Sequence, residues 1–304
     1  MTSKHILDRL HGIMPPVVTP FNRRGDIDEG AFRSNLRRYT GTGLAGVVVA
    51  GTTGEAPFLT ADERLRLIEI ARKVMRPDEL VVAGTGLEGT RATIDLSREA
   101  IARGADVVLV LTPGYYRAKL DPSALLGHFR AVADAVRRPV LVYSIPQCTG
   151  MKLPVEVIAS LARHQNIEGL KESSGDLEYV HAILARVPRG FRVFSGNVPI
   201  LLEVLRAGGA GGIMGQACFA PKLCVAFYEA WRQGNHERAE DLFAHLAPLA
   251  TDVNVRYGTP AVKAAMDVVG FRGGNPRIPL LPVPASARRS IARTIKASLA
   301  GLSL

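Results

Sequence analysis

The chain has 304 residues, a formal net charge of +10 at pH 7, 47% hydrophobic residues and 22% charged residues. This composition is typical of a folded globular protein rather than a disordered one, and no run of about 18 apolar residues predicts a membrane span. The basic residues occur singly or in pairs such as Arg23-Arg24, without interleaved aromatic residues. We therefore do not expect the protein to bind nucleic acid.

Eight short apolar runs follow one another along the chain, at intervals typical of βα units. They are Ile13–Val18, Ala45–Ala50, Leu80–Ala83, Asp106–Leu111, Pro139–Tyr143, Ile167–Lys171, Phe191–Ser195 and Gly211–Met214. Helical patterns lie between them: residues Thr60 to Glu63 predict a capping box, and Asp121-Pro122 predicts an N-cap followed by a proline at the first helical position. Eight strands in regular alternation with helices favour a (β/α)8 TIM barrel over an open doubly wound sheet.

After Pro221 the strand pattern stops and helical spacing of apolar residues continues. Helices are expected over Pro221–Arg232, Glu237–Ala247 and Thr259–Val269. We expect residues 1–220 to form the barrel that carries the active site. Residues 221–304 would form a C-terminal helical extension in the same structural unit, because no low-complexity linker separates the two parts.

The cysteines and the N-terminal segment predict a cytoplasmic location. Cys148, Cys218 and Cys224 are odd in number and form no Cys-x-x-Cys pair, which argues against a disulfide framework and a thiolate zinc site. The first twelve residues lack the apolar run and small-residue cleavage site of a signal peptide.

Two further patterns bear on cofactors. Gly84 to Gly89 matches GxGxxG, but the next strand pattern ends in Thr112-Pro113-Gly114 rather than in the acidic residue of a dinucleotide site. A tight βα turn explains these glycines. None of the seven histidines pairs with another at i+2 or i+4, so we expect neither a cofactor nor a metal ion.

Lys171 is the leading candidate for catalysis. Of the eight lysines, seven fall in helical or loop patterns where a solvated side chain is the default, whereas Lys171 closes an apolar strand pattern. Strand alternation is expected to place Ile167, Gly169 and Lys171 on one face, with the glycine leaving space beneath the lysine. The carboxyl end of a barrel strand is where barrel enzymes build their active sites. Burial there favours the neutral amine, which can attack a carbonyl carbon. A lysine extending from the rim into water is the alternative.

Other polar residues end neighbouring strand patterns on the same expected face. Tyr143 ends the preceding strand, where a phenol can relay protons to and from a Schiff base; a rim aromatic that merely packs under a loop is the alternative. The turn that contains Thr52 and Thr53 offers hydroxyl and N–H groups suited to a carboxylate. Tyr115-Tyr116 follows the fourth strand pattern.

These stretches together resemble the dihydrodipicolinate synthase / N-acetylneuraminate lyase superfamily over nearly the whole chain. The matching stretches are GTTGE at 51–55, TPGYY at 112–116, YSIP at 143–146 with Thr149-Gly150, GLKESSGD at 169–176 and FSGN at 194–197. The resemblance implies class I aldolase chemistry, in which a lysine captures pyruvate or a longer 2-oxo acid as an imine.

The resemblance also implies the roles of single residues. Lys171 is the Schiff-base residue and Tyr143 the proton relay. Thr52 and Thr53 bind the carboxylate of the 2-oxo acid, and Thr53 connects Tyr143 to Tyr116. Tyr116 reaches the site from a neighbouring subunit, which implies a homotetramer built as a dimer of dimers. Two further residues, Gly196 and Ile213, line the imine pocket.

One departure bears on the substrate. Dihydrodipicolinate synthases carry an arginine for the carboxylate of aspartate semialdehyde where this chain has Cys148, and a thiol cannot supply that charged bidentate contact. The chain looks closest to 4-hydroxy-2-oxoglutarate aldolases, although Thr52-Thr53 replaces the Ser-Asn described in animal members. Retro-aldol cleavage of a 4-hydroxy-2-oxo acid is therefore the leading hypothesis. The alternatives are condensation of pyruvate with aspartate semialdehyde and a catalytically silent 2-oxo acid-binding homologue.

Overall fold

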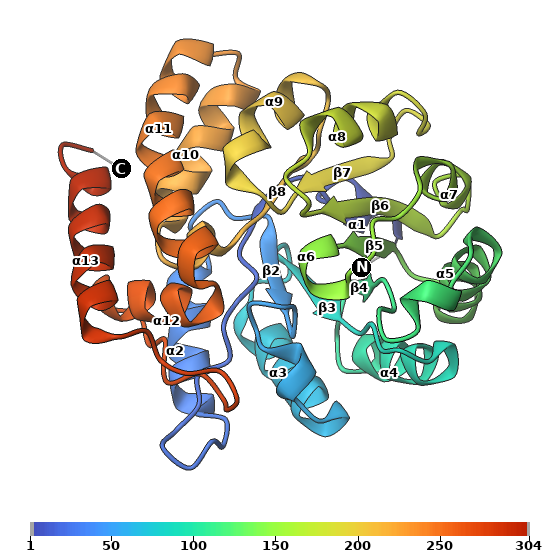
Figure 1. Cartoon of the computed structure of the whole chain (residues 1–304), viewed down its shortest axis with the longest axis horizontal. Helices are drawn as coiled ribbons and strands as arrows, with labels where there is room; N and C mark the ends of the chain where they lie inside the picture. The colour runs from blue at the N-terminus through green and yellow to red at the C-terminus, as the bar shows by residue number, and fades with distance from the viewer. Residues whose placement is uncertain (1–2, 303–304) are drawn as a thin grey trace. The chain divides into compact units, whose positions relative to one another are not determined.

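The computed structural model describes residues 3–302 (Figure 1). Its eight strands form one sheet in the order β1-β8-β7-β6-β5-β4-β3-β2. This order confirms the (β/α)8 TIM barrel. The strands are β1 (Gly12–Met14), β2 (Gly46–Val49), β3 (Leu80–Gly84), β4 (Val107–Leu111), β5 (Val140–Ser144), β6 (Ile167–Glu172), β7 (Arg192–Ser195) and β8 (Gly211–Ile213).

The contacts divide the described residues into two compact units, and the first comprises residues 3–11 and 80–212. Strands β3 to β7 are parallel within it. The helices are α1 (Ser3–Leu7), α4 (Thr90–Ala102), α5 (Pro122–Val136), α6 (Pro146–Thr149), α7 (Val155–Leu161), α8 (Leu177–Leu184) and α9 (Leu201–Arg206), with short 3-10 turns η2 (Arg117–Lys119) and η3 (Val198–Ile200). Of these, α4, α5, α7 and α8 lie along the outside of the strands (Figure 1).

Packing between these strands and helices explains the alternation of the strand sequences. Val108 and Val110 of β4 and Val142 of β5 are buried in one hydrophobic cluster with Phe129 and Val132 of α5. The residues that alternate with them point to the opposite face of the sheet. Tyr143 and Lys171 lie on this second face, near the carboxyl ends of β5 and β6.

The second unit comprises residues 12–79 and 213–304, of which the structure describes those up to 302. Here Pro16 forms a parallel bridge with Val48 of strand β2. Helices α10, α11 and α13 stand side by side (Figure 1). The helical elements are α2 (Glu29–Tyr39), η1 (Ala56–Phe58), α3 (Ala61–Val74), η4 (Gly215–Cys218), α10 (Pro221–Arg232), α11 (His236–Leu249), the π-helical η5 (Ala250–Val255), α12 (Thr259–Val268) and α13 (Ala285–Leu299).

Most element predictions are confirmed within a residue or two. Thr60 and Glu63 form the capping box of α3, and Asp121 caps α5 with Pro122 at its first position. The first strand is the exception, because β1 ends at Met14 instead of Val18. Pro15 and Pro16 follow and have no N–H to donate to a ladder, so only an isolated bridge continues the pairing.

Two other predictions concern the whole chain. The boundary at residues 220 and 221 between barrel and helical extension stays a prediction. Within residues 3–302, no helix combines the length and the apolar character that a membrane span requires. The cytoplasmic location likewise stays a prediction.

Candidate active site

Lys171 is one of two buried lysines among the eight of the chain, with 4% of its surface exposed. It lies near the end of β6, a strand that pairs with β5 on one side and β7 on the other. Its partners in register are Tyr143 of β5 and Phe194 of β7. Pairing on both sides fixes the backbone of Lys171. Its amine is thereby held inside the protein at the carboxyl end of a barrel strand, where barrel enzymes place their chemistry.

The Tyr143 side chain lies directly beside this amine. Nζ of Lys171 is 4.1 Å from the centroid of the Tyr143 ring, and Tyr143 is itself buried. The carbonyl oxygen of Tyr143 accepts hydrogen bonds from the Thr112 backbone N–H at 3.0 Å and the Thr112 hydroxyl at 2.9 Å. A primary amine and a phenol held this close can exchange protons with one bound carbonyl compound.

The structure corrects the expected arrangement of β6. Register with β5 shifts between Val140, which faces Ile167, and Leu141, which faces Gly169. One extra residue on β6 breaks the alternation, so Ile167 joins the hydrophobic cluster of Leu170 instead of sharing a face with Lys171. The alternation of residues along a strand does not predict this bulge.

Gly169 also has a different role from the one expected. A Cβ on Gly169 would lie 2.3 Å from the Arg192 carbonyl oxygen and 2.8 Å from Cδ2 of Leu141. The glycine therefore leaves no space beneath the lysine. It permits close approach of β6 to its two neighbours, which holds Lys171 in place.

Gly196 makes a similar close approach after β7. A Cβ there would lie 1.9 Å from the Ser173 hydroxyl oxygen, and the Gly196 N–H donates to the Glu172 carbonyl at 2.6 Å. The loops after β6 and β7 are thus packed together. Ile213, the last residue of β8, is buried and belongs to the second unit. The pocket-lining roles of Gly196 and Ile213 stay predictions.

Sequence reasoning missed two polar residues in the first unit near Lys171. Burial raises the pKa of the Glu172 carboxyl, which accepts a hydrogen bond from the Ser174 N–H at 2.8 Å. The Gln147 amide donates to the carbonyl oxygens of Ser173 and Ser174 at 2.9 and 3.0 Å. Both contacts hold the loop that follows β6. A glutamate next to a strand-end lysine was the available signal for the first.

Cys148, which stands where the family resemblance implies an arginine, lies in the short helix α6. Desolvation raises the pKa of its thiol, whereas the charge of nearby Lys171 acts in the opposite direction. The thiol is therefore neutral at neutral pH and supplies no positive charge for a carboxylate.

A cation from another loop lies close to this helix. A Cβ on Gly150, the left-handed residue that ends α6, would be 2.8 Å from Nε of Arg117 and 3.3 Å from its Cζ. The Arg117 guanidinium therefore packs against the chain two residues beyond Cys148. The sequence analysis did not single out Arg117.

Tyr115 and Tyr116 are exposed after β4, with 76% and 69% of their surfaces accessible. Their rings meet edge to face at 4.9 Å. The Glu88 carboxylate accepts from the N–H groups of Gly114 and Tyr115, with shortest distances of 3.1 and 2.9 Å. The turn is thus anchored to its own unit while the Tyr116 side chain extends into solvent.

The threonine turn belongs to the second unit. Thr52 and Thr53 are half-buried after β2. The turn is closed by hydrogen bonds from the Glu55 N–H to the Thr52 carbonyl at 3.0 Å and from the Ala56 N–H to the Gly51 carbonyl at 3.2 Å. Their carboxylate-binding role, and the connection of Thr53 with Tyr143 and Tyr116, stay predictions.

The other buried lysine, Lys263, corrects the expectation that the remaining lysines are solvated. Lys263 lies in α12 and is 1% exposed. Its ammonium pairs with the equally buried carboxylate of Glu55. A lysine at helical spacing offered no sign of burial, because its partner lies more than two hundred residues away in the sequence.

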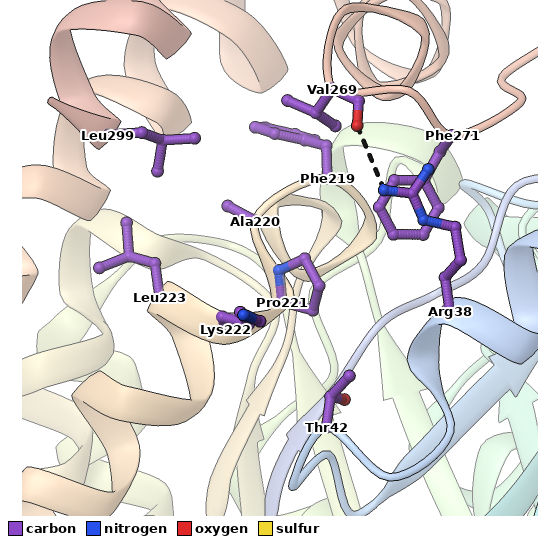
Figure 2. Close-up of a pocket in the computed structure, with 10 residues that line it drawn as sticks. All are labelled: Arg38, Thr42, Phe219, Ala220, Pro221, Lys222, Leu223, Val269, Phe271 and Leu299. Atoms are coloured by element: carbon purple, nitrogen blue, oxygen red, sulfur yellow. Dashed lines mark hydrogen bonds between the residues drawn. The ribbon is translucent and has the colours of Figure 1, made fainter. Parts of the chain in front are cut away.

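The second unit also contains an apolar pocket of about 390 Å³. Figure 2 shows Leu223 and Leu299 on one side and Phe271 on the other, where the Arg38 guanidinium lies 3.9 Å from the ring centroid and donates to the Val269 carbonyl. None of the site residues expected from the sequence lines this pocket.

Metal and cofactor expectations remain open. Among residues 3–302, no three side chains of His, Cys, Asp or Glu gather as metal ligands. That the reaction needs no metal ion or cofactor stays a prediction.

Comparison with known proteins decides the family. The model of the dihydrodipicolinate synthetase family matches residues 9–298. The chain belongs to this family. Its members are lysine Schiff-base lyases and aldolases, and this protein is an enzyme of that kind.

Among curated relatives, the 4-hydroxy-tetrahydrodipicolinate synthase of Macrococcus caseolyticus is 38% identical over 267 residues, which cover 88% of this chain and 89% of the relative. The enzyme of that name from Methanopyrus kandleri is 37% identical over 291 residues, covering 95% and 96%.

Solved structures agree with the fold. Dihydrodipicolinate synthase from Aquifex aeolicus superimposes with a TM-score of 0.91 at 28% identity, covering 97% of this chain and 100% of that one. YagE, a prophage protein of the family from E. coli K12 in complex with pyruvate, gives a TM-score of 0.90 at 27% identity, with 95% and 98% covered.

Proposed function

We propose that the protein captures pyruvate as an imine on Lys171 and condenses it with aspartate semialdehyde. The observation that carries the imine is the buried Lys171 amine, held 4.1 Å from the Tyr143 ring centroid. The relatives described above, both named 4-hydroxy-tetrahydrodipicolinate synthase, favour condensation over the retro-aldol cleavage that the sequence analysis ranked first.

The chemistry follows from an amine beside a phenol. The neutral Lys171 amine adds to the keto carbon, and the resulting carbinolamine loses water to give an iminium ion. Loss of a proton from the methyl carbon gives an enamine, whose carbon forms a bond to the aldehyde carbon of the second substrate. Tyr143 donates the proton that lets water leave, accepts the methyl proton as the enamine forms, and donates it to the aldehyde oxygen as the new carbon–carbon bond forms. The Thr52-Thr53 turn is proposed, from the family resemblance, to bind the carboxylate.

Arg117 supports a second carboxylate site despite Cys148. Its guanidinium lies beside Gly150 at the end of α6, and an arginine provides the planar, charged donors that suit a carboxylate. We propose that Arg117 binds the carboxylate of the second substrate in this protein.

Cleavage of a 4-hydroxy-2-oxo acid is the second candidate function, and the neutral Cys148 thiol favours it. It runs through the same enamine in reverse, so Lys171 and Tyr143 serve both reactions. Steady-state rates with pyruvate plus aspartate semialdehyde, and with 4-hydroxy-2-oxoglutarate, decide between them. A higher kcat/KM for cleavage would reverse the ranking proposed here.

Borohydride reduction tests the shared chemistry. Treatment with pyruvate and borohydride should leave a stable adduct on Lys171, located by peptide mass mapping. Lys263 provides an internal control, because it is equally buried but its ammonium lies against the Glu55 carboxylate and two carbonyl oxygens. No adduct on Lys171 would contradict the proposal, and an adduct without turnover of any aldehyde would favour a silent binding homologue.

A further inference from the structure

The threonine turn lies between two strained residues. Ala50 has φ of 54° and Glu55 has φ of 59°, both in the left-handed region. Non-glycine residues occupy this region at an energetic cost and stay there only where surrounding contacts hold them. Contacts that maintain this conformation therefore control the shape of the Thr52-Thr53 turn.

The side chain of Glu55 makes the first set of such contacts. One carboxylate oxygen pairs with the Lys263 ammonium, and the other accepts from the Arg277 backbone N–H at 2.8 Å. The Glu55 side chain is entirely buried. It joins the end of the turn to α12 and to the segment that follows this helix.

Lys263 contacts two backbone carbonyl groups as well as Glu55. Besides the ion pair with Glu55, Nζ donates to the carbonyl oxygens of Thr19 and Asn275, both at 2.8 Å. Two carbonyl oxygens and one carboxylate therefore surround the ammonium. The buried cation also neutralises the Glu55 carboxylate, which would otherwise repel an anion bound at the turn.

Thr19 connects the cation to the other side of the turn. Its hydroxyl donates to the Gly54 carbonyl at 2.7 Å, while its own carbonyl accepts from Lys263. Gly54 packs closely as well, since a Cβ there would lie 3.0 Å from the Val17 carbonyl oxygen. Thr19 therefore holds the turn at Gly54, and Lys263 holds it at Glu55. Lys263 also binds the Thr19 carbonyl and so connects the two contacts.

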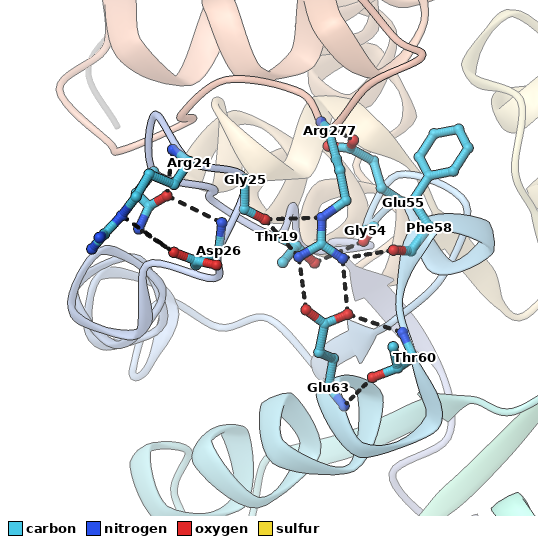
Figure 3. Close-up of polar contacts among 11 residues, drawn as sticks. Thr19, Arg24, Gly25, Asp26, Gly54, Glu55, Phe58, Thr60, Glu63 and Arg277 are labelled. Atoms are coloured by element: carbon cyan, nitrogen blue, oxygen red, sulfur yellow. Dashed lines mark hydrogen bonds and ion pairs between the residues drawn. The ribbon is translucent and has the colours of Figure 1, made fainter.

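Arg277 fixes the chain just beyond the turn (Figure 3). Its guanidinium makes two parallel hydrogen bonds with Glu63 at 2.8 and 2.7 Å. It also donates to the carbonyl oxygens of Phe58 at 2.6 Å and Gly25 at 2.7 Å. Phe58 is the last residue of η1, which begins directly after Glu55. The same arginine thereby contacts Glu55 through its backbone and η1 through its side chain.

We propose that Glu55 and Lys263 are positioning residues for the Thr52-Thr53 turn, which hold it in the conformation that binds the carboxylate of the 2-oxo acid. The inference rests on the proposed carboxylate-binding role of that turn. Neither residue touches substrate. Their effect is to orient the hydroxyl and N–H groups of the turn in advance and to cancel the charge buried behind it.

The test measures pyruvate binding through the trapped adduct on Lys171. Lys263→Met keeps an unbranched side chain one atom shorter and removes its charge. We expect the pyruvate concentration for half-maximal trapping to rise about tenfold, with the extent of trapping at saturation unchanged. The double variant Glu55→Gln/Lys263→Met removes both charges. Its pyruvate concentration for half-maximal trapping should lie between those of Lys263→Met and the wild type, because no unpaired buried charge remains.

Two further variants separate positioning from general stability. Tyr39→Phe deletes another buried hydrogen bond of the second unit, from the Tyr39 hydroxyl to the Cys218 carbonyl, and should lower Tm without changing half-saturation. Thr19→Val removes only the hydroxyl contact with Gly54 and should raise half-saturation less than Lys263→Met. It supplies the measurement if Lys263→Met does not fold.

The outcomes distinguish this inference from the proposed function. Suppose that the wild-type protein forms the adduct on Lys171, and that Lys263→Met and Thr19→Val need the same pyruvate concentration for half-maximal trapping as the wild type. That result would overturn the positioning role alone. An equal rise in Tyr39→Phe would overturn it too, because the effect would then follow stability. Absence of an adduct in the wild-type protein would overturn the proposed function itself.

Discussion

At the scale of single residues, substrate choice depends on what replaces the family's arginine. Cys148 offers a neutral thiol, and Arg117 brings a guanidinium to the same end of α6 from a different loop. Both candidate reactions involve a carboxylate besides that of the 2-oxo acid group: the single carboxylate of aspartate semialdehyde, or the distal carboxylate of 4-hydroxy-2-oxoglutarate. A charge moved from one loop to another can therefore preserve recognition while the sequence motif is lost.

Arg117→Ala should raise KM for the substrate that carries this second carboxylate by about 10-fold or more, because a hydrogen bond to a charged group is lost. Half-saturation for pyruvate should not change. Lys119→Ala is the matched control, since it removes another exposed cation from the same 3-10 turn. Equal effects of the two substitutions on KM would indicate a general charge effect and would refute the role of Arg117.

At the scale of elements, the position of Lys171 depends on how closely β6 approaches its neighbours. Gly169→Ala would place a methyl group 2.3 Å from the Arg192 carbonyl oxygen. We expect a loss of about 1–3 kcal/mol in the free energy of unfolding, typical of overpacking, together with slower adduct formation on Lys171. Urea denaturation and the trapping rate measure the two effects.

Gly127→Ala is the control for this substitution. Gly127 lies in the middle of α5 with no atom within 4 Å of a Cβ placed on it, so alanine should stabilise the helix by about 0.5–1 kcal/mol. A Gly169→Ala variant as stable as the wild type would mean that β6 can shift, and the close approach would not be what fixes Lys171.

The limits of prediction from sequence are visible in the same elements. Eight strands and their helices follow from local periodicity, and the pairing of Lys171 with Tyr143 follows because both end adjacent parallel strands. The bulge opposite Val140 and Leu141 leaves no local signature in the sequence, so the predicted face of Ile167 was wrong. Lys263 was misjudged for a related reason: its burial results from contacts with Thr19 and Glu55, which only the folded chain brings together.

At the scale of the whole molecule, the exposed tyrosine pair is the main indication of assembly. Large aromatic side chains that are more than two-thirds exposed are unusual on a free surface and common at interfaces. Tyr115 and Tyr116 also sit on a turn that Glu88 anchors, so they present a fixed surface. We therefore retain the homotetramer implied by the family as a proposal for this chain.

Subunit complementation tests whether Tyr116 acts across an interface. Lys171→Ala chains lack the amine, and Tyr116→Phe chains lack the phenol, so each should be weakly active alone. If Tyr116 serves the neighbouring subunit, a refolded mixture contains sites with Lys171 from one chain and Tyr116 from the other, and activity should return. If Tyr116 served its own chain, no complete site could form in any hybrid. Recovery in the mixture, with sedimentation confirming mixed oligomers, would thus establish the shared site, whereas mixed oligomers without recovery would exclude it.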